Sequence, residues 1–220
     1  MLVLETAHPA AIRRQVSLCE AVYEGETAVE GMRGIRVETL ADADAVWAQN
    51  AVPVLIDPTG ACLLQARPAV LVDAIIAKKN LGTTIDMAPL VIGVGPGFTA
   101  GQDVHLVIES MRGHNLARII TDGMAQPNTG VPGNIAGFTS ERVIHAPAAG
   151  YIHDVRKIGD IVQKGDEIAR IYPDKESYDN ALSEYVPVNA TITGIIRGLI
   201  REGYYFRKGV QDSGYRSARE

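Results

Sequence analysis

Short apolar runs separated by polar turns dominate the hydrophobic pattern of this chain. Runs of about four to eight apolar residues are typical of strands buried inside a sheet. The pattern predicts such strands at 1–5, 35–38, 52–57, 69–76, 90–94 and 116–121. Apolar residues at helical spacing predict a helix ending at Val22 and helices at 40–49 and 103–112. Strands that alternate with short helices are typical of a parallel α/β sheet.

One stretch, residues 90–101, begins as an apolar strand and then becomes rich in glycine. The predicted helix follows it at Asp103. A strand, a glycine loop and a helix start together point free backbone N–H groups and a positive helix end at an anion. A tight turn without a ligand is the alternative, and it stays open. The glycine spacing is neither that of a P-loop nor a clean G-x-G-x-x-G, so nucleotide hydrolysis has no support.

Charged side chains accompany the predicted strands and helices. Asp57 and Asp73 end two of the strands. Because open α/β sheets bind ligands at the carboxyl ends of their strands, both would lie at the edge that holds the glycine loop. Each alone is also typical of a turn or a helix cap. Arg13 and Arg14 lie near a predicted helix start, where their charge opposes the helix dipole, which indicates either an anionic ligand or a solvated face.

The first predicted strand, residues 1–5, ends in an acid, as does the second strand of a dinucleotide-binding fold. In that fold a first strand and its glycine turn come roughly twenty residues earlier. This sequence does not contain them. We therefore predict an α/β fold with a Rossmann-like, mostly parallel sheet whose first strand and glycine turn are missing.

The last third of the chain contains a loose internal repeat. Residues 145–152 recur as 185–192, and the glycines at 159 and 165 match those at 203 and 209. Two such halves are typical of a small all-β barrel-sandwich of the biotinyl/lipoyl type. In that fold a modified lysine lies on the hairpin between the halves, and Lys175 falls close to that position, although its flanking residues do not match.

We therefore predict two domains. The first is a Rossmann-like α/β domain at 1–138, and the second is a biotinyl/lipoyl-like β domain at 139–220. A segment rich in turn residues, 126–134, precedes the boundary.

Composition and charge limit the function classes. The chain has 220 residues and a net charge of −5, which argues against a nucleic-acid binder. Cys19 and Cys62 lack metal or redox spacing and are expected to be reduced thiols of a cytoplasmic protein. No run is long enough to span a membrane. The histidines show no metal-binding spacing and no serine-hydrolase motif occurs, so we predict neither a metal site nor a recognisable catalytic set.

Seven motifs spread over nearly the whole chain are shared with one known family. They are AIRR at 11–14, EAVYEG at 20–25, AKKNLGT at 77–83, GPGFTAG at 95–101, RGHN at 112–115, PNTGVPG at 127–133 and IRGLI at 196–200. Together they resemble the YqeB-type accessory proteins of selenium-dependent molybdenum hydroxylase systems. The resemblance implies a cytoplasmic maturation factor that handles a molybdenum cofactor, its nucleotide or the hydroxylase. The implied partners are the hydroxylase or its cofactor-insertion machinery, without nucleic acid or membrane, and a homo-oligomer is compatible with this role.

Three functions remain open from the sequence. The first is a non-catalytic maturation factor that binds an anionic ligand, a nucleotide or a molybdopterin-type cofactor, at the glycine loop. The second is an enzyme that acts on a nucleotide or cofactor through Asp57 or Asp73. The third is a carrier module modified on Lys175. The predicted cofactor-binding residues are Gly93, Gly95, Gly97, Phe98, Thr99, Ala100, Gly101, Asp103, Arg13, Arg14, Asp73, Lys78, Lys79 and Asn128.

Overall fold

The structure is a computed structural model that describes residues 1–130, 133, 137–181, 184–206 and 215–218. Contacts group the chain into two compact units. Unit 1 comprises 1–59 and 134–220, and unit 2 comprises 60–133. The predicted domains 1–138 and 139–220 stay a prediction. Of the residues singled out above, 131–132, Asn134 and Gly209 lie outside the described ranges.

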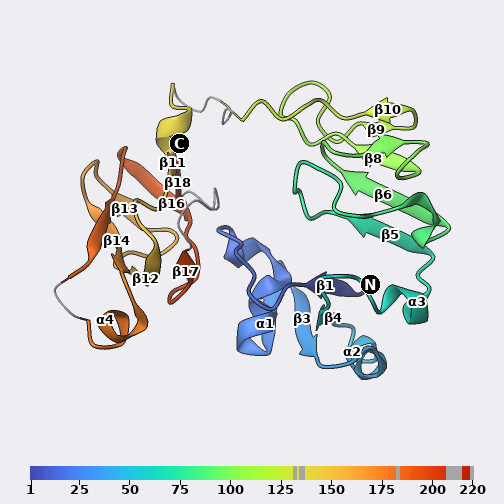
Figure 1. The fold of residues 1–220 in the computed structure, drawn as a ribbon, viewed down its shortest axis with the longest axis horizontal. Coiled ribbons are helices and arrows are strands. Elements are labelled where there is room, and N and C mark those ends of the chain that lie inside the picture. The colour runs from blue at the N-terminus through green and yellow to red at the C-terminus, as the bar shows by residue number, and fades with distance from the viewer. Residues whose placement is uncertain (131–132, 134–136, 182–183, 207–214, 219–220) are drawn as a thin grey trace. The chain divides into compact units, whose positions relative to one another are not determined.

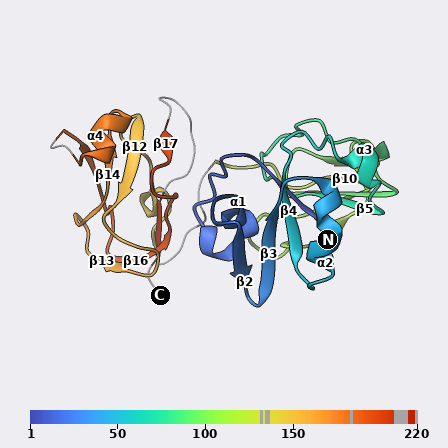
Figure 2. The same cartoon turned by 90° about the horizontal axis from the view of Figure 1, so that it is seen from below.

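The first part of unit 1 is a sheet of four strands, β1 (Val3–Glu5), β2 (Glu26–Val29), β3 (Met32–Val37) and β4 (Val52–Ile56). Their order is β1-β4-β3-β2, and Figure 2 shows β2, β3 and β4 side by side. β1, β4 and β3 run parallel, whereas β2 and β3 are antiparallel. Val54 in β4 is fully buried and packs with Ala21 and Val22. The apolar runs at the start of the chain are therefore strands, as predicted.

Short helices accompany this sheet. They are two 3-10 turns at Arg14–Val16 and Leu18–Glu20, α1 (Ala21–Glu24), a 3-10 turn at Leu40–Asp42 and α2 (Ala43–Trp47). The carboxylate of Asp42 accepts the backbone N–H of Thr39 at 2.9 Å, which caps the start of the second helical stretch. The helix predicted at 40–49 is therefore confirmed. The helix predicted to end at Val22 is broken at Ser17, whose backbone is extended.

The described residues of unit 2 form α3 (Leu63–Ala66), a 3-10 turn at Ile85–Met87 and six strands. The strands are β5 (Val70–Asp73), β6 (Leu90–Val94), β7 (Thr99–Ala100), β8 (Leu106–Ile108), β9 (Ile119–Ile120) and β10 (Gly123–Met124). Four of them form a sheet in the order β5-β6-β8-β9, drawn in green in Figure 1. β5, β6 and β8 run parallel, and β9 is antiparallel to β8. Val91, Phe98, Val104 and Val107 fill the core beneath this sheet.

The helix predicted at 103–112 is wrong, because this stretch contains strand β8. Val104 and Val107 are both fully buried, and their separation matched a helical period. The carboxylate of Asp103 accepts the backbone N–H of Thr99 at 2.9 Å and closes a tight turn instead of starting a helix. The β-branched residues that follow favour an extended backbone.

The described residues form a mixed α/β fold with parallel and antiparallel sheets rather than one continuous parallel sheet. Asp57 follows β4, whereas Asp73 ends β5, so the two carboxylates end strands of different sheets. The prediction that they share one sheet edge is therefore wrong. The narrower Rossmann-like description is not confirmed.

The second part of unit 1 is built mainly from strands, with a 3-10 turn at Ser140–Arg142 and helix α4 (Lys175–Asp179). The strands are β11 (Val143–Ile144), β12 (Gly150–Asp154), β13 (Ile161–Val162), β14 (Glu167–Tyr172), β15 (Val186–Asn189), β16 (Gly194–Gly198), β17 (Tyr205–Phe206) and β18 (Tyr215–Ala218). They form two antiparallel sheets, β15-β14-β12-β17 and β11-β18-β16-β13. Ile152, Ile168, Ile171 and Leu199 lie in one shared core. We call this part the β module; its assignment to the biotinyl/lipoyl type stays a prediction.

Candidate functional site

The carboxyl ends of three parallel strands in unit 2 define the first candidate site. β5 ends at Asp73, β6 at Val94 and β8 at Ile108. Backbone contacts join the loops that leave these strands: the N–H of Gly95 donates to the carbonyl of Ile108 at 2.8 Å. Open α/β sheets bind ligands at this edge. We call these ends and their loops the carboxyl edge of unit 2.

The loop that leaves β5, residues 74–83, is braced by side chains. Asp73 is buried, and its carboxylate accepts the Thr83 hydroxyl at 2.6 Å and the backbone N–H of Ile75 at 3.1 Å. The side-chain oxygen of Asn80 accepts the backbone N–H groups of Gly82 and Thr83, both at 2.8 Å. Both Asp73 oxygens are thus committed to holding the loop, which makes this residue a structural brace rather than a free acid or base.

Thr83→Val is expected to lower the free energy of unfolding of unit 2 by about 1–2 kcal/mol. Valine has the shape of threonine but cannot donate to the buried Asp73 carboxylate, which then loses one partner. Thr84→Val is the matched control, because the Thr84 hydroxyl bonds to Asp86 at an exposed position. Urea denaturation of both variants tests this, and equal losses in the two would contradict it.

Gly97 lies in the glycine-rich segment that follows β6, residues 95–101, which we call the glycine turn. At Gly97 this turn lies close to the loop at 74–83. A Cβ at Gly97, where φ is +112°, would lie 2.6 Å from the Cα of Lys79. Ile76 and Lys78 also have positive φ, a conformation that is strained for residues other than glycine. Lys78 and Lys79 are both exposed. The loop therefore presents two cations in a fixed backbone conformation beside the glycine turn.

The other residues of the predicted anion-binding loop at 93–103 take part in core packing and turn formation. The Phe98 ring lies where a Cβ at Gly93 would be, and Phe98 and Ala100 are buried in the core. The N–H groups of Gly95, Thr99, Gly101 and Asp103 donate to groups of unit 2. Because no helix starts at Asp103, the positive helix end expected there is absent, and that part of the prediction was wrong.

Of the other predicted site residues, Arg13 and Arg14 belong to unit 1, whereas the glycine turn belongs to unit 2. Asn128 is exposed in unit 2. Lys175 begins helix α4 after β14, and its ammonium pairs with Asp179 at 2.6 Å. It therefore lies on a short helix in the connection between the antiparallel strands β14 and β15.

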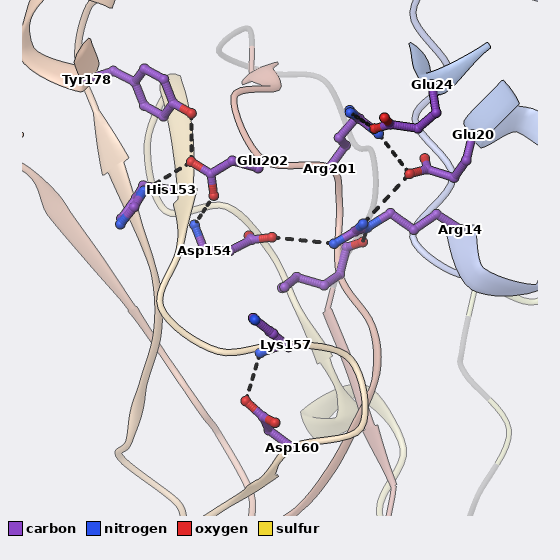
Figure 3. A network of polar contacts seen from close by, with 11 residues as sticks. Arg14, Glu20, Glu24, His153, Asp154, Lys157, Asp160, Tyr178, Arg201 and Glu202 are labelled. Carbon is purple, nitrogen blue, oxygen red and sulfur yellow. Dashed lines mark hydrogen bonds and ion pairs between the residues drawn. The ribbon is translucent and has the colours of Figure 1, made fainter. Parts of the chain in front are cut away.

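A polar network inside unit 1, shown in Figure 3, was not predicted from the sequence. Arg14 approaches Asp154 at 3.5 Å and Glu20 at 3.7 Å. Arg201 donates to Glu20 at 2.9 Å and also pairs with Glu24. These pairs join the N-terminal helical turns to the β module.

Backbone bonds reinforce this junction. The N–H of Leu199 donates to the carbonyl of Ile12 at 2.8 Å, and Nε of Arg14 donates to the carbonyl of Leu199 at 3.2 Å. The guanidinium of Arg14 therefore pairs with carboxylates of the protein itself, those of Asp154 and Glu20. Its position near a helix start, which indicated a ligand or a solvated face, is explained by acidic partners elsewhere in unit 1.

Glu202 organises the other end of the network. Its carboxylate accepts the Tyr178 hydroxyl at 2.6 Å and the backbone N–H of Asp154 at 2.5 Å, and it lies 3.0 Å from Nδ1 of His153 (Figure 3). The Asp154 side chain is 13% exposed, and its Oδ1 is buried with no hydrogen-bond partner among the described residues. Burial and the charge of Glu202 raise the pKa of Asp154 to about 7, although Arg14 acts in the opposite direction.

Two further findings concern the described ranges. No group of three or more His, Cys, Asp or Glu side chains there could hold a metal ion. Every helix in those ranges is too short or too polar to cross a membrane.

The comparisons with known proteins give one strong match. No protein-family model matches the chain. Over 203 residues, or 92% of its length, the chain is 44% identical to a protein of Escherichia coli (strain K12) named "Uncharacterized protein YqeB". The chain spans only 35% of the length of that relative.

Solved structures match more weakly. The ectoine utilization protein EutE (DoeB) from Ruegeria pomeroyi, in its product-bound structure, is 19% identical with a TM-score of 0.31, over 47% of this chain and 29% of that chain. A succinylglutamate desuccinylase/aspartoacylase from Rhodobacter sphaeroides is 12% identical with a TM-score of 0.32, over 100% of this chain and 57% of that chain. Likeness at this level carries no information about function.

Proposed function

We propose, starting from the YqeB-family membership that the 44% identity supports, that the chain is an accessory factor in the maturation of a selenium-dependent molybdenum hydroxylase. It would hold a small anionic ligand, a nucleotide or a molybdopterin-type cofactor, at the carboxyl edge of unit 2. The observation that carries this proposal is the braced loop 74–83, which presents Lys78 and Lys79 beside the glycine turn. The partner would be the hydroxylase or its cofactor-insertion machinery.

The proposed function requires this site to bind an anion and does not require it to catalyse a reaction. Two lysine ammonium groups supply up to six N–H donors that suit phosphate oxygens. The loop is ordered before the ligand arrives, which reduces the entropy lost on binding. Asp73 places the loop through hydrogen bonds from Thr83 and Ile75. This role of Asp73 favours a binding protein over an enzyme that uses Asp73 as an acid or base.

The carrier function has weaker support. A carrier lysine must extend from the protein to reach its modifying enzyme. Lys175 instead lies on a helix, paired with Asp179 and placed over the ring of Tyr178.

A double variant, Lys78→Met with Lys79→Met, is expected to bind ATP and pyrophosphate at least about tenfold more weakly, since each charge-assisted contact contributes roughly 1 kcal/mol or more. Methionine keeps the length and apolar stem of lysine and removes only the charge. Lys157→Met with Lys164→Met is the matched control, because both lysines are exposed in the β module and the net charge changes equally. Isothermal titration calorimetry of the full chain measures the effect. Equal weakening in the two double variants would contradict the proposed site.

The maturation role is tested separately from ligand binding. Cofactor-free hydroxylase is incubated with molybdopterin cofactor and either the unmodified chain or the Lys78/Lys79 double variant. We expect hydroxylase activity to recover faster with the unmodified chain than with the variant or with no added chain. Ligand binding without any gain in hydroxylase activity would overturn the maturation role and leave the anion site standing.

A further inference from the structure

Three tyrosines gather on one face of the β module, and we call them the tyrosine cluster: Tyr151, Tyr178 and Tyr205. Tyr151 in β12 lies directly opposite Tyr205 in β17, with ring centroids 4.8 Å apart. Tyr178 in α4 lies 5.9 Å from the Tyr151 ring. Tyr205 is 44% exposed on an edge strand. The cluster is thus an aromatic surface that is partly open to solvent.

Carboxylates surround this surface. Glu202 accepts the Tyr178 hydroxyl at 2.6 Å (Figure 3). Burial raises the pKa of Tyr178, and the negative charges of Glu202, Asp179 and Asp154 raise it further. The Glu202 carboxylate accepts the Tyr178 hydroxyl, and the Asp179 carboxylate pairs with Lys175 beside the same ring, so two carboxylates give the cluster a negative potential. That potential favours a positively charged group over an anion at the cluster.

The cluster already holds one cation of its own chain. The Lys175 ammonium lies 4.7 Å from the Tyr178 ring centroid and 5.7 Å from that of Tyr151. Its second partner is Asp179. Lys175 remains 58% exposed at the side chain, so this contact is open to exchange with solvent. Aromatic faces combined with a carboxylate form the chemical environment that binds ammonium and guanidinium groups.

We propose that the tyrosine cluster is a docking site for an arginine-bearing basic segment of a partner protein, whose guanidinium stacks on Tyr205 and Tyr151 and displaces Lys175 from the rings. Tyrosine is enriched at protein interfaces because it supplies a large, rigid, amphipathic contact. A planar guanidinium stacks on aromatic rings and pairs with carboxylates such as Asp179. The charge complementarity between this acidic aromatic surface and a basic segment identifies the kind of partner.

The test measures fluorescence anisotropy of a labelled hexa-arginine peptide with the full chain at low salt. Tyr205→Ala is expected to weaken binding about threefold to fivefold, because one cation–π contact is lost. Tyr205→Leu, which keeps an apolar side chain on the strand, is expected to weaken it similarly while preserving the fold. A hexa-glutamate peptide is expected not to compete with hexa-arginine, and any binding of it is expected to be unchanged in Tyr205→Ala. Thermal unfolding of each variant verifies that the β module remains folded.

A lysine comparison separates a specific site from diffuse charge. Lys175→Met removes the resident cation and is expected to tighten hexa-arginine binding more than Lys164→Met, which changes the net charge equally at another exposed position. Equal effects of the two lysine variants, or unchanged binding in folded Tyr205→Leu, would overturn the proposal. Since Lys78 and Lys79 take no part, loss of the anion site would leave this result unaffected.

Discussion

Gly150→Ala is expected to lower the free energy of unfolding of the β module by about 3 kcal/mol or more. Gly150 begins β12 with φ at +147°, and a Cβ there would lie 2.1 Å from the carbonyl oxygen of Tyr172. That oxygen belongs to the backbone of β14, which is central in its sheet and cannot move without disturbing its ladders. The effect is measured as the change in urea midpoint followed by circular dichroism.

Gly159→Ala is the control that separates the clash from backbone strain. Gly159 also has a positive φ, +101°, but a Cβ there meets nothing within 4 Å. We expect it to cost about 1–2 kcal/mol, the penalty for placing alanine in a left-handed conformation. Equal losses for Gly150→Ala and Gly159→Ala would contradict the close approach of β12 to β14.

Asp154→Asn is expected to stabilise the protein at pH 8 by on the order of 2–4 kcal/mol and to have little effect near pH 3. The pKa of Asp154 is raised from its ordinary 3.8 to about 7 in the folded protein, chiefly by burial. A raised pKa means that the folded state favours the protonated carboxyl. The stability that Asp154 contributes is therefore fully present below pH 3.8, is lost as the pH rises towards 7, and stays lost above that. Asparagine mimics the neutral form at every pH.

Urea denaturation across this pH range tests the Asp154 prediction. Asp44→Asn, at an exposed position in α2, is the control for removing one negative charge. Glu202→Gln is expected to lower the pKa of Asp154, because it removes the like charge that raises it. If Asp154→Asn were destabilising at pH 8, the ion pair of Asp154 with Arg14 would outweigh the burial of its charge, and the account of this junction would be wrong.

Local sequence features predicted the strands whose apolar runs have clear ends. The run at 52–57 is continuous, is followed by Pro58 and Gly60, and forms β4. The helix at 40–49 carries its own cap through Thr39 and Asp42. In such cases the conformation is determined by neighbouring residues, so a single sequence contains the necessary information.

The helix predicted at 103–112 failed for a physical reason. A strand of three residues next to a buried turn places Val104 and Val107 in the core at a spacing that also suits a helix. Pairing with β6 decides the conformation, and that partner is not encoded locally. β-branched residues were the signal that could have favoured the strand.

The candidate site was predicted only in part. Lys78, Lys79 and Gly97 were chosen from sequence, and the structure brings Gly97 against the backbone of Lys79. The network around Asp154 and Glu202 was missed, because these residues lie far apart in the sequence and meet only where the turn before β17 approaches the end of β12. The positive charge of Arg14 near a predicted helix start was the one feature of the sequence that indicated this network.

A substitution at Gly97 and a substitution of Lys78 or Lys79 test different properties of the candidate site. A side chain at Gly97 would collide with the Lys79 backbone, so Gly97→Val disturbs the loop as well as any ligand contact. The lysine variants remove charge and leave the backbone unchanged. They are therefore the better probes of anion binding.

The most direct measurement is a nuclear magnetic resonance titration of the isotope-labelled full chain with ATP. The account predicts saturable backbone amide shifts concentrated at residues 76–80, Gly95 and Gly97, and their loss in the Lys78→Met, Lys79→Met variant. Saturable shifts located elsewhere, or no shifts at millimolar ATP, pyrophosphate and molybdopterin alike, would contradict the claim that the carboxyl edge of unit 2 holds an anionic ligand.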